Sequence, residues 1–276
     1  MKSNSPTLRH VVPSRGGRPA SGICAVTSFD DDVFVVRYNS ELIEVYSAVT
    51  FLLQRHLRIP ELRPNPYGLV ACTYNNCLYA SVFDDNRLRR VDLTGGSVVK
   101  KWTVASGPAG LSVNGARNVV VTCCEARKLH EYTTLGTLVR EISLQAGVMS
   151  PWHAVQLSTG DYVVSQNTSP GAVSVVGANG QVAHSYESSQ TSCIGPMLFP
   201  SNLSLARSGH ILVADVDNNR ILSVNSSLDS ARNLALSVDG GIQEPCSFCL
   251  DESRDQLYVG EFGGLYRLLI FDGVSL

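Results

Sequence analysis

Residues 211–225, ILVADVDNNRILSVN, decide the fold of this chain. An apolar segment runs into a polar turn, and a second apolar segment begins at Arg220. The turn is rich in aspartate and asparagine, so it is either a ligand site or a structural turn. A pattern that recurs along the chain indicates a structural unit, and a search for internal repeats therefore comes first.

The pattern recurs about every 45 residues. The units open with SGICAV, PYGLVA, PAGLSV, PWHAVQL, PSNLSL and PCSFCL, and each contains short strand-like segments separated by polar or glycine-containing turns. The small residues that anchor the alignment lie 42 to 49 residues apart and are Gly22, Gly68, Gly110, His153, Asn202 and Ser247. Six such units predict an all-β fold, a six-bladed β-propeller with four antiparallel strands per blade.

The last unit indicates how the ring closes. After LYRLLIFDGVSL the sequence ends, which leaves that unit with three strands, while residues 7–14, TLRHVVPS, resemble the fourth-strand segment LVREISL. We expect residues 7–14 to complete the last blade, so that no open seam remains. The predicted single domain, residues 1–276, has blades near 22–63, 64–106, 107–150, 151–199, 200–244 and 245–276 plus 7–14.

The turn at 215–220 fits a structural role. Aspartate and asparagine favour turns because their side chains bond local backbone and tolerate left-handed φ. Asp215 and Arg220 flank the turn and could pair across it. An EF-hand calcium loop would also need a glycine in the middle of the loop and a distal glutamate, and the stretch has neither.

The stretch ILVADVDNNRIL resembles an NHL repeat, in which a strand ends in Ala-Asp and a short turn leads through Asn-x-Arg-Ile into a second strand. LYASVFDDNRLRRV in the second unit is a weaker version. The chain as a whole is similar to divergent NHL propellers, which occur alone or as the C-terminal part of TRIM-NHL ubiquitin ligases. This resemblance implies a module that recognises a protein, such as a ligase substrate, or RNA. The chain has no RING or B-box framework of cysteines and histidines.

Composition limits the other possibilities. The net charge of −2 gives no basic excess of the kind that nucleic-acid binders use to neutralise phosphates. The N-terminus lacks the apolar core of a signal peptide, and no apolar run approaches the roughly 20 residues that span a bilayer. We therefore expect a cytoplasmic protein without a membrane partner, monomeric as an isolated domain.

The eight cysteines fit buried, reduced thiols better than a disulfide framework, because most lie in apolar strand-like runs. Cys246 and Cys249 match the C-x-x-C pattern, but positions i and i+3 of a strand point to opposite faces. A zinc site would need a second pair at suitable spacing, and the sequence has none.

One face of the propeller is expected to carry the binding site. Loops that lead into the first strands share this face with the turns between second and third strands. The predicted binding residues are Tyr67, Trp152, His153 and Asn202 near the channel mouth, with Phe83, Arg87 and Arg220 farther out. A mixed-charge rim around an aromatic centre suits a protein or peptide. RNA is the alternative, bound through the arginines and stacked on Tyr67 and Trp152. For Trp152 and His153, a packing role and a ligand contact both remain open.

An enzyme is the second alternative. Six-bladed relatives include calcium-dependent lactonases and metal-dependent lyases, which need several carboxylates or histidines converging on the channel. Among the first-strand anchors only Asn202 is a good ligand for a hard cation, and the six histidines lie at non-equivalent blade positions. We therefore predict no catalytic residue, no metal site and no cofactor, with a metal-dependent hydrolase or lyase kept as an alternative.

Overall fold

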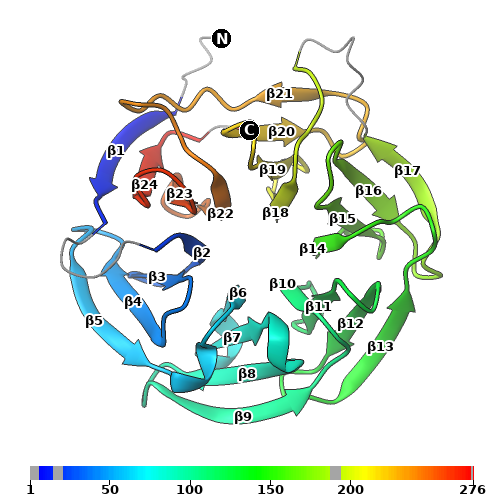
Figure 1. Ribbon diagram of the computed structural model, residues 1–276, viewed down its shortest axis with the longest axis horizontal. Helices are drawn as coiled ribbons and strands as arrows, with labels where there is room; N and C mark the ends of the chain where they lie inside the picture. The colour runs from blue at the N-terminus through cyan, green and yellow to red at the C-terminus, as the bar shows by residue number, and fades with distance from the viewer. Residues whose placement is uncertain (1–5, 15–20, 187–193, 275) are drawn as a thin grey trace.

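In the computed structural model, six four-stranded antiparallel sheets stand around a central axis (Figure 1). The structure describes residues 6–14, 21–186, 194–274 and 276. In five blades the strands follow one another in chain order from the channel to the rim, so the chain winds outward and then returns to begin the next blade; in the last blade the N-terminal strand is outermost. This arrangement confirms the six-bladed propeller that the repeat predicts.

The first three blades contain the strands β2 to β13, four to a blade. They are β2 (Ile23–Phe29), β3 (Asp32–Arg37), β4 (Leu42–Ser47), β5 (Leu53–Arg58), β6 (Pro66–Cys72), β7 (Cys77–Val82), β8 (Arg87–Asp92), β9 (Ser97–Thr103), β10 (Pro108–Val113), β11 (Val119–Cys123), β12 (Lys128–Tyr132) and β13 (Leu138–Ser143).

The other three blades contain the strands β14 to β24 and the N-terminal strand β1. They are β14 (Pro151–Gln156), β15 (Tyr162–Gln166), β16 (Ala172–Val176), β17 (Val182–Tyr186), β18 (Pro200–Leu205), β19 (Ile211–Asp215), β20 (Arg220–Val224), β21 (Ala231–Asn233), β22 (Pro245–Asp251), β23 (Gln256–Glu261), β24 (Leu268–Asp272) and β1 (Thr7–Val12).

Three short 3-10 helices accompany the strands: η1 (Pro60–Leu62), η2 (Thr73–Asn75) and η3 (Phe83–Asp85). Over the described part of the chain, no helix has the length and apolar character required to cross a bilayer.

The position of a strand within its blade explains its composition. All five residues of β19 are buried, because neighbouring blades cover both faces of a middle strand. On the rim strand β13, by contrast, five of the six residues are exposed, and Arg140 and Glu141 are among them. Charged side chains on such a rim strand disfavour pairing with another chain.

The last blade closes as predicted. Strand β1 pairs antiparallel with β24, from Thr7 opposite Asp272 to Val12 opposite Leu268. The His10 ring stacks on Phe51 of the first blade with ring centroids 5.3 Å apart. The N-terminal strand therefore joins the first and last blades without a covalent link.

Two predicted segments differ from the structure. In blade 1 the residue equivalent to Gly68 is Ala25 rather than Gly22. Ile23 opens the first strand of blade 1 and pairs with Arg37, as Pro66 in blade 2 pairs with Val82, and the anchor lies two residues after this opening residue. In blade 5, the predicted fourth strand ARNLALSV contributes only the three residues of β21. The chain then leaves the sheet, since the Leu236 N–H donates to the Leu234 carbonyl instead of to β20.

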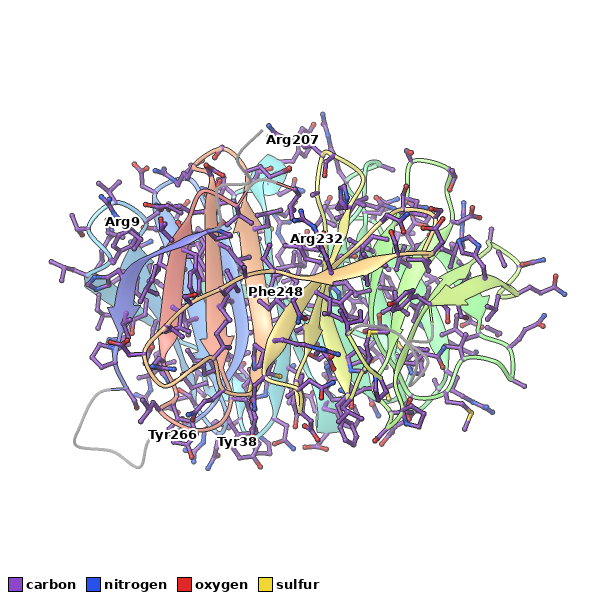
Figure 2. All side chains as sticks on the ribbon, turned by 90° about the horizontal axis from the view of Figure 1, so that it is seen from above. Arg9, Tyr38, Arg207, Arg232, Phe248 and Tyr266 are labelled. Carbon is purple, nitrogen blue, oxygen red and sulfur yellow. The ribbon has the colours of Figure 1, made fainter. Side chains whose placement is uncertain are left out.

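The two faces of the ring carry different connections. One face, which we call the link face, carries the turns between second and third strands and the links between blades; Tyr38 and Tyr266 lie there (Figure 2). The opposite face carries the turns between first and second and between third and fourth strands, and Arg207 marks it (Figure 2).

The described cysteines are all free thiols. Burial raises the pKa of Cys123 to about 12 and that of Cys246 to about 12, so both stay protonated at neutral pH. Cys193 lies outside the described residues. Cys24, Cys72, Cys77 and Cys123 are buried and pack in the apolar interior, whereas Cys124, Cys246 and Cys249 are partly exposed.

Candidate functional site

The innermost strands share a β-bulge at the link face. In each blade, the residue that opens the first strand pairs with the last residue of the second strand, and the register then shifts. A bulge of this kind re-aims the side chain beside it. The residues that follow the opening position are Cys24, Tyr67, Ala109, Trp152, Ser201 and Cys246. They form a ring, which we call the mouth ring, around the channel at the link face.

Three of the predicted binding residues meet at this ring. The Tyr67 and Trp152 rings pack edge to face with centroids 5.2 Å apart, and the Phe83 ring lies 5.8 Å from Tyr67 and 6.0 Å from Trp152. Tyr67 and Phe83 belong to blade 2 and Trp152 to blade 4, so the cluster bridges blade 3, whose mouth-ring residue is the small Ala109. All three aromatic side chains are only half-buried.

A second aromatic pair lies on the same face. Tyr38 in blade 1 and Phe262 in blade 6 are equivalent to Phe83 in blade 2. The backbone N–H of each of the three donates to the carbonyl of the residue just before the first strand of its blade. The Tyr38 and Phe262 rings pack edge to face at 6.0 Å. Burial, with a smaller contribution from nearby thiols, raises the pKa of Tyr67 to about 12, so its hydroxyl stays protonated.

His153 has a structural role. Its Nε2 lies 2.9 Å from the Leu111 carbonyl oxygen of blade 3, and its Nδ1 accepts the Leu203 N–H of blade 5 at 3.1 Å. These partners require the neutral ring with its proton on Nε2. Burial lowers the pKa of His153 to about 4. The packing interpretation is thus the one the structure favours, and the ring is not offered to a ligand.

His153 belongs to a series of equivalent braces between blades. Asn202 Oδ1 accepts the Phe248 N–H at 3.3 Å, and Ser247 Oγ accepts the Val26 N–H at 3.0 Å. Each side chain bonds a backbone N–H in the following blade. That N–H belongs to the residue directly after the one that is equivalent to the bonding residue. Asn202 also lies in the wall of the channel cavity, away from the aromatic cluster. Its binding role at the channel mouth stays a prediction.

The turn at 215–220 fastens its blade to the neighbouring links. Asp215 is fully buried and pairs with Arg220 at 2.6 Å, as the flanking positions suggested. The Arg220 guanidinium also bonds the carbonyls of Ile194 and Pro196. Asn219, in the left-handed region at φ 53°, accepts the Glu244 N–H at 2.7 Å. These contacts give the cluster a structural role and engage Nε, Nη1 and Nη2 of Arg220.

Arg87 remains exposed at the start of β8. Within the described ranges its guanidinium has no hydrogen-bond or ion-pair partner. Of the seven predicted binding residues, Tyr67, Phe83 and Trp152 are brought together, and Arg87 lies four residues beyond Phe83 on the link face. His153, Asn202 and Arg220 hold blades or links in place.

Two exposed apolar residues in the described links between blades were not predicted. Met149 is 57% exposed and Phe199 36% exposed, and both precede the proline that opens a first strand. The signal in the sequence was an apolar residue inside a link rich in glycine, serine and proline, as in QAGVMSP and IGPMLFP. In the same links Val148 and Met197 are fully buried, so Met149 and Phe199 are the apolar residues that the fold leaves partly on the surface.

The channel contains a cavity of about 620 Å³ that reaches toward the opposite face. Its wall includes Thr27, Asn114, His153, Gln156 and Asn202, and the other lining residues are mostly aliphatic. None of the described lining residues carries a carboxylate, and His153 is already committed at both nitrogens. In the described ranges, no three histidine, cysteine or acidic side chains are grouped so that they could hold a metal ion. These donors do not fit the hard-cation site of a calcium-dependent hydrolase.

A second cavity, of about 630 Å³, lies at the rim between blades 5 and 6 and is lined mainly by residues 233–244.

Comparison with solved structures supports the architecture. A streptogramin B lyase matches with a TM-score of 0.70 at 12% identity, covering 95% of this chain and 97% of that chain. Virginiamycin B lyase from Staphylococcus aureus matches with a TM-score of 0.68 at 12% identity, covering 96% and 99%. Kuenenia stuttgartiensis hydrazine synthase matches with a TM-score of 0.66 at 13% identity, covering 95% and 99%. At this identity the likeness shows the propeller fold alone.

No protein-family model and no curated protein matches the chain.

Proposed function

We propose that this chain is a non-catalytic recognition module of NHL type that binds a protein partner through its link face. The observation that carries the proposal is the half-buried cluster of Tyr67, Phe83 and Trp152 at the channel mouth. Large aromatic side chains on a rigid scaffold supply the anchoring contacts of protein interfaces. A module of this kind would select the substrate of a ubiquitin ligase if it acted with one.

The structure gives the two alternatives less support. A metal-dependent hydrolase or lyase needs carboxylates or free histidines in the channel, and the described channel wall offers only neutral groups. An RNA-binding surface needs several available cations; Arg220 pairs with Asp215 and Lys128 pairs with Glu141 at 2.6 Å, which leaves Arg87 as the predicted cation that the described residues do not pair. The aromatic cluster could also stack bases, so the shortage of available cations is what favours a protein partner over RNA.

The test is selection of peptides from a displayed library of random 16-residue sequences, with the purified chain as bait. Selected peptides are then synthesised and titrated against wild type, Trp152→Ala and Tyr74→Ala. Tyr74 is 64% exposed on the opposite face and is the matched aromatic control. Loss of a central aromatic anchor costs about 2 kcal/mol or more, or about thirtyfold in affinity.

The proposal predicts that Trp152→Ala weakens binding by about that factor while Tyr74→Ala leaves it unchanged. Thermal melting of both variants checks that each one folds. Recovery of no peptide above background would overturn the proposal, as would peptides that bind a folded Trp152→Ala variant at full affinity. Single-stranded RNA that binds tightly, with loss on Arg87→Glu, would favour the RNA alternative.

A further inference from the structure

The channel cavity is a second enclosed space, away from the aromatic cluster. Its volume of about 620 Å³ lies within the range of about 300–1,000 Å³ that small-molecule sites occupy. The first strands of all six blades contribute to its wall. Gly115 and Ser158, in the turns after two of these strands, extend the wall to the face opposite the link face. The cavity is therefore a candidate binding space that does not involve the link face.

Aliphatic side chains make up much of this wall. Five of them come from five different blades, and the fold leaves each one only partly buried: Val70, Val113, Leu157, Leu205 and Leu250. A hydrocarbon ligand that covered these side chains would remove their exposed surface from water, which is favourable. The wall therefore fits a ligand that is mainly hydrocarbon.

Two amide side chains in the wall have hydrogen-bonding atoms to spare. Asn202 accepts the Phe248 N–H with Oδ1, and no acceptor among the described residues bonds its Nδ2. Gln156 donates with Nε2 to the Gly160 carbonyl at 3.2 Å and to the Tyr162 hydroxyl at 3.1 Å, and no described donor bonds its Oε1. Both amides are partly exposed in the wall. A carbonyl of a ligand fits Asn202 Nδ2, and a hydroxyl fits Gln156 Oε1.

A buried carboxylate behind the wall is already satisfied. Glu131 is 6% exposed, and its oxygens accept hydrogen bonds from Asn114 at 2.9 Å, Asn118 at 2.8 Å and Tyr162 at 3.1 Å. Asn114 lines the cavity and stands between this carboxylate and the ligand space. Hydrogen bonds hold the pKa of Glu131 below its usual range, so the carboxylate stays ionised without a ligand.

The turns between first and second strands carry charged residues, several of which engage a neighbouring blade. The engaged pairs are Arg254 with Asp31, Arg207 with Glu252, and Arg117 with the ring of Tyr74. Three aspartates in the same turns have no ion-pair partner among the described residues and lie outside the cavity wall: Asp30, Asp161 and Asp255. An anion would approach these aspartates and then lose its water against the aliphatic wall. An uncharged molecule avoids both costs.

We propose that the channel cavity binds an uncharged, mainly hydrocarbon small molecule, a carbonyl oxygen of which accepts a hydrogen bond from Asn202 Nδ2. The aliphatic side chains of the five blades surround the body of this ligand. The site goes beyond the proposed function, because it lies away from the link face and takes a small molecule rather than a protein.

The experiment titrates the full chain with prodan, an uncharged naphthyl ketone whose fluorescence rises and shifts to shorter wavelength in apolar surroundings. Three smaller naphthalenes, substituted at the same ring position, then compete with prodan. Methyl naphthyl ketone has the carbonyl, ethylnaphthalene lacks it, and naphthoate has nearly the shape of the ketone but carries a negative charge.

Three variants locate the binding site. Ser204→Phe places a ring in the cavity, because Ser204 lines it and its hydroxyl has no partner among the described residues. Ser226→Phe makes the same change on an exposed turn of the same blade and is the matched control. Asn202→Asp keeps an oxygen for the Phe248 N–H but removes the Nδ2 donor. Thermal melting checks that each variant folds.

We expect prodan to bind wild type saturably, with about one molecule per chain, and to raise its melting temperature. Ser204→Phe weakens prodan binding about tenfold or more, while Ser226→Phe stays within about twofold of wild type. In wild type, methyl naphthyl ketone competes about fivefold better than ethylnaphthalene and about tenfold better than naphthoate. Asn202→Asp removes the advantage of the ketone over ethylnaphthalene.

Absence of saturable prodan binding by wild type would overturn the channel site, as would full affinity in a folded Ser204→Phe variant. Naphthoate that competes as well as the ketone would overturn the uncharged ligand class, and this comparison needs wild type alone. A preference for the ketone that persists in folded Asn202→Asp would overturn the contact with Asn202. Trp152 lies outside the cavity wall, so Trp152→Ala should bind prodan as wild type does, and the channel site and the proposed function fail separately.

Discussion

Protonation of His153 should destabilise the propeller at mildly acidic pH. The neutral ring joins blades 3 and 5, since Nδ1 accepts the Leu203 N–H and Nε2 bonds the Leu111 carbonyl. A proton on Nδ1 would remove the acceptor and place a charge in a site that is only 5% exposed. The fold therefore binds this proton less readily than the unfolded chain does.

The magnitude follows from the two pKa values. Burial lowers the pKa of His153 from 6.5 in the unfolded chain to about 4 in the fold. Between these pKa values the unfolded chain binds more protons, so the free energy of unfolding falls as the pH is lowered. At 1.36 kcal/mol per pKa unit, lowering the pH from 7 to 5 costs about 2 kcal/mol, and the full loss below pH 4 is about 3 kcal/mol.

Urea denaturation between pH 7 and pH 5 measures this loss in wild type and in His153→Gln, which keeps an acceptor and a donor but does not titrate. His130, whose pKa is also lowered by burial, is present in both proteins and its contribution cancels. We expect the difference in unfolding free energy between the two proteins to change by about 2 kcal/mol over this range. Parallel pH profiles for the two proteins would refute the stabilising role of the neutral His153 ring between blades 3 and 5.

Three further predictions concern the fold. Gly110→Ala places a methyl group against the His153 ring and should cost about 1–3 kcal/mol in urea denaturation, whereas Gly115→Ala, with nothing within 4 Å, should not destabilise the fold; equal stabilities would contradict the contact. Asp215→Ala strands Arg220 and the Leu198 N–H and should cost about 3–5 kcal/mol; the exposed control Asp217→Ala should change stability by less than about 0.5 kcal/mol, and similar losses in both would contradict the buried pair. Deletion of residues 1–12 removes β1 and opens the β24 edge, so light scattering should detect association and the melting temperature should fall; a stable monomer would contradict closure by β1.

The repeat and its closure could be predicted because strand periodicity and turn residues are local properties of the sequence. The segments that were misplaced depend on contacts with other blades. Gly22 resembled the anchor of blade 1 because it precedes an apolar run, yet strand register rather than residue size defines the equivalent position. The fourth strand of blade 5 ends early where Arg267, held by Glu261 at 2.6 Å, binds the carbonyls of Asp239 and Gly241 in the following link.

The same distinction between local sequence properties and contacts with other blades applies to the candidate site. Tyr67 and Trp152 could be placed at the channel mouth because their distance from the opening proline fixes their position in the blade. The roles of His153 and Arg220 could not be predicted, because their hydrogen-bond partners lie in other blades or in links. The exposure of Met149 and Phe199 could not be predicted, because the sequence does not distinguish them from the buried Val148 and Met197 in the same links.

The most direct measurement of partner binding at the link face uses the two tryptophans of the chain. Trp152 lies in the aromatic cluster, while Trp102 packs against Tyr79 and Tyr132 on the rim of blade 2 and serves as an internal control. Indole N–H resonances are recorded by NMR while a selected peptide is added. We expect the Trp152 resonance to shift and saturate with the peptide while the Trp102 resonance stays in place. A saturable shift of Trp102 alone, or saturation of binding with both resonances unmoved, would contradict binding at the link face.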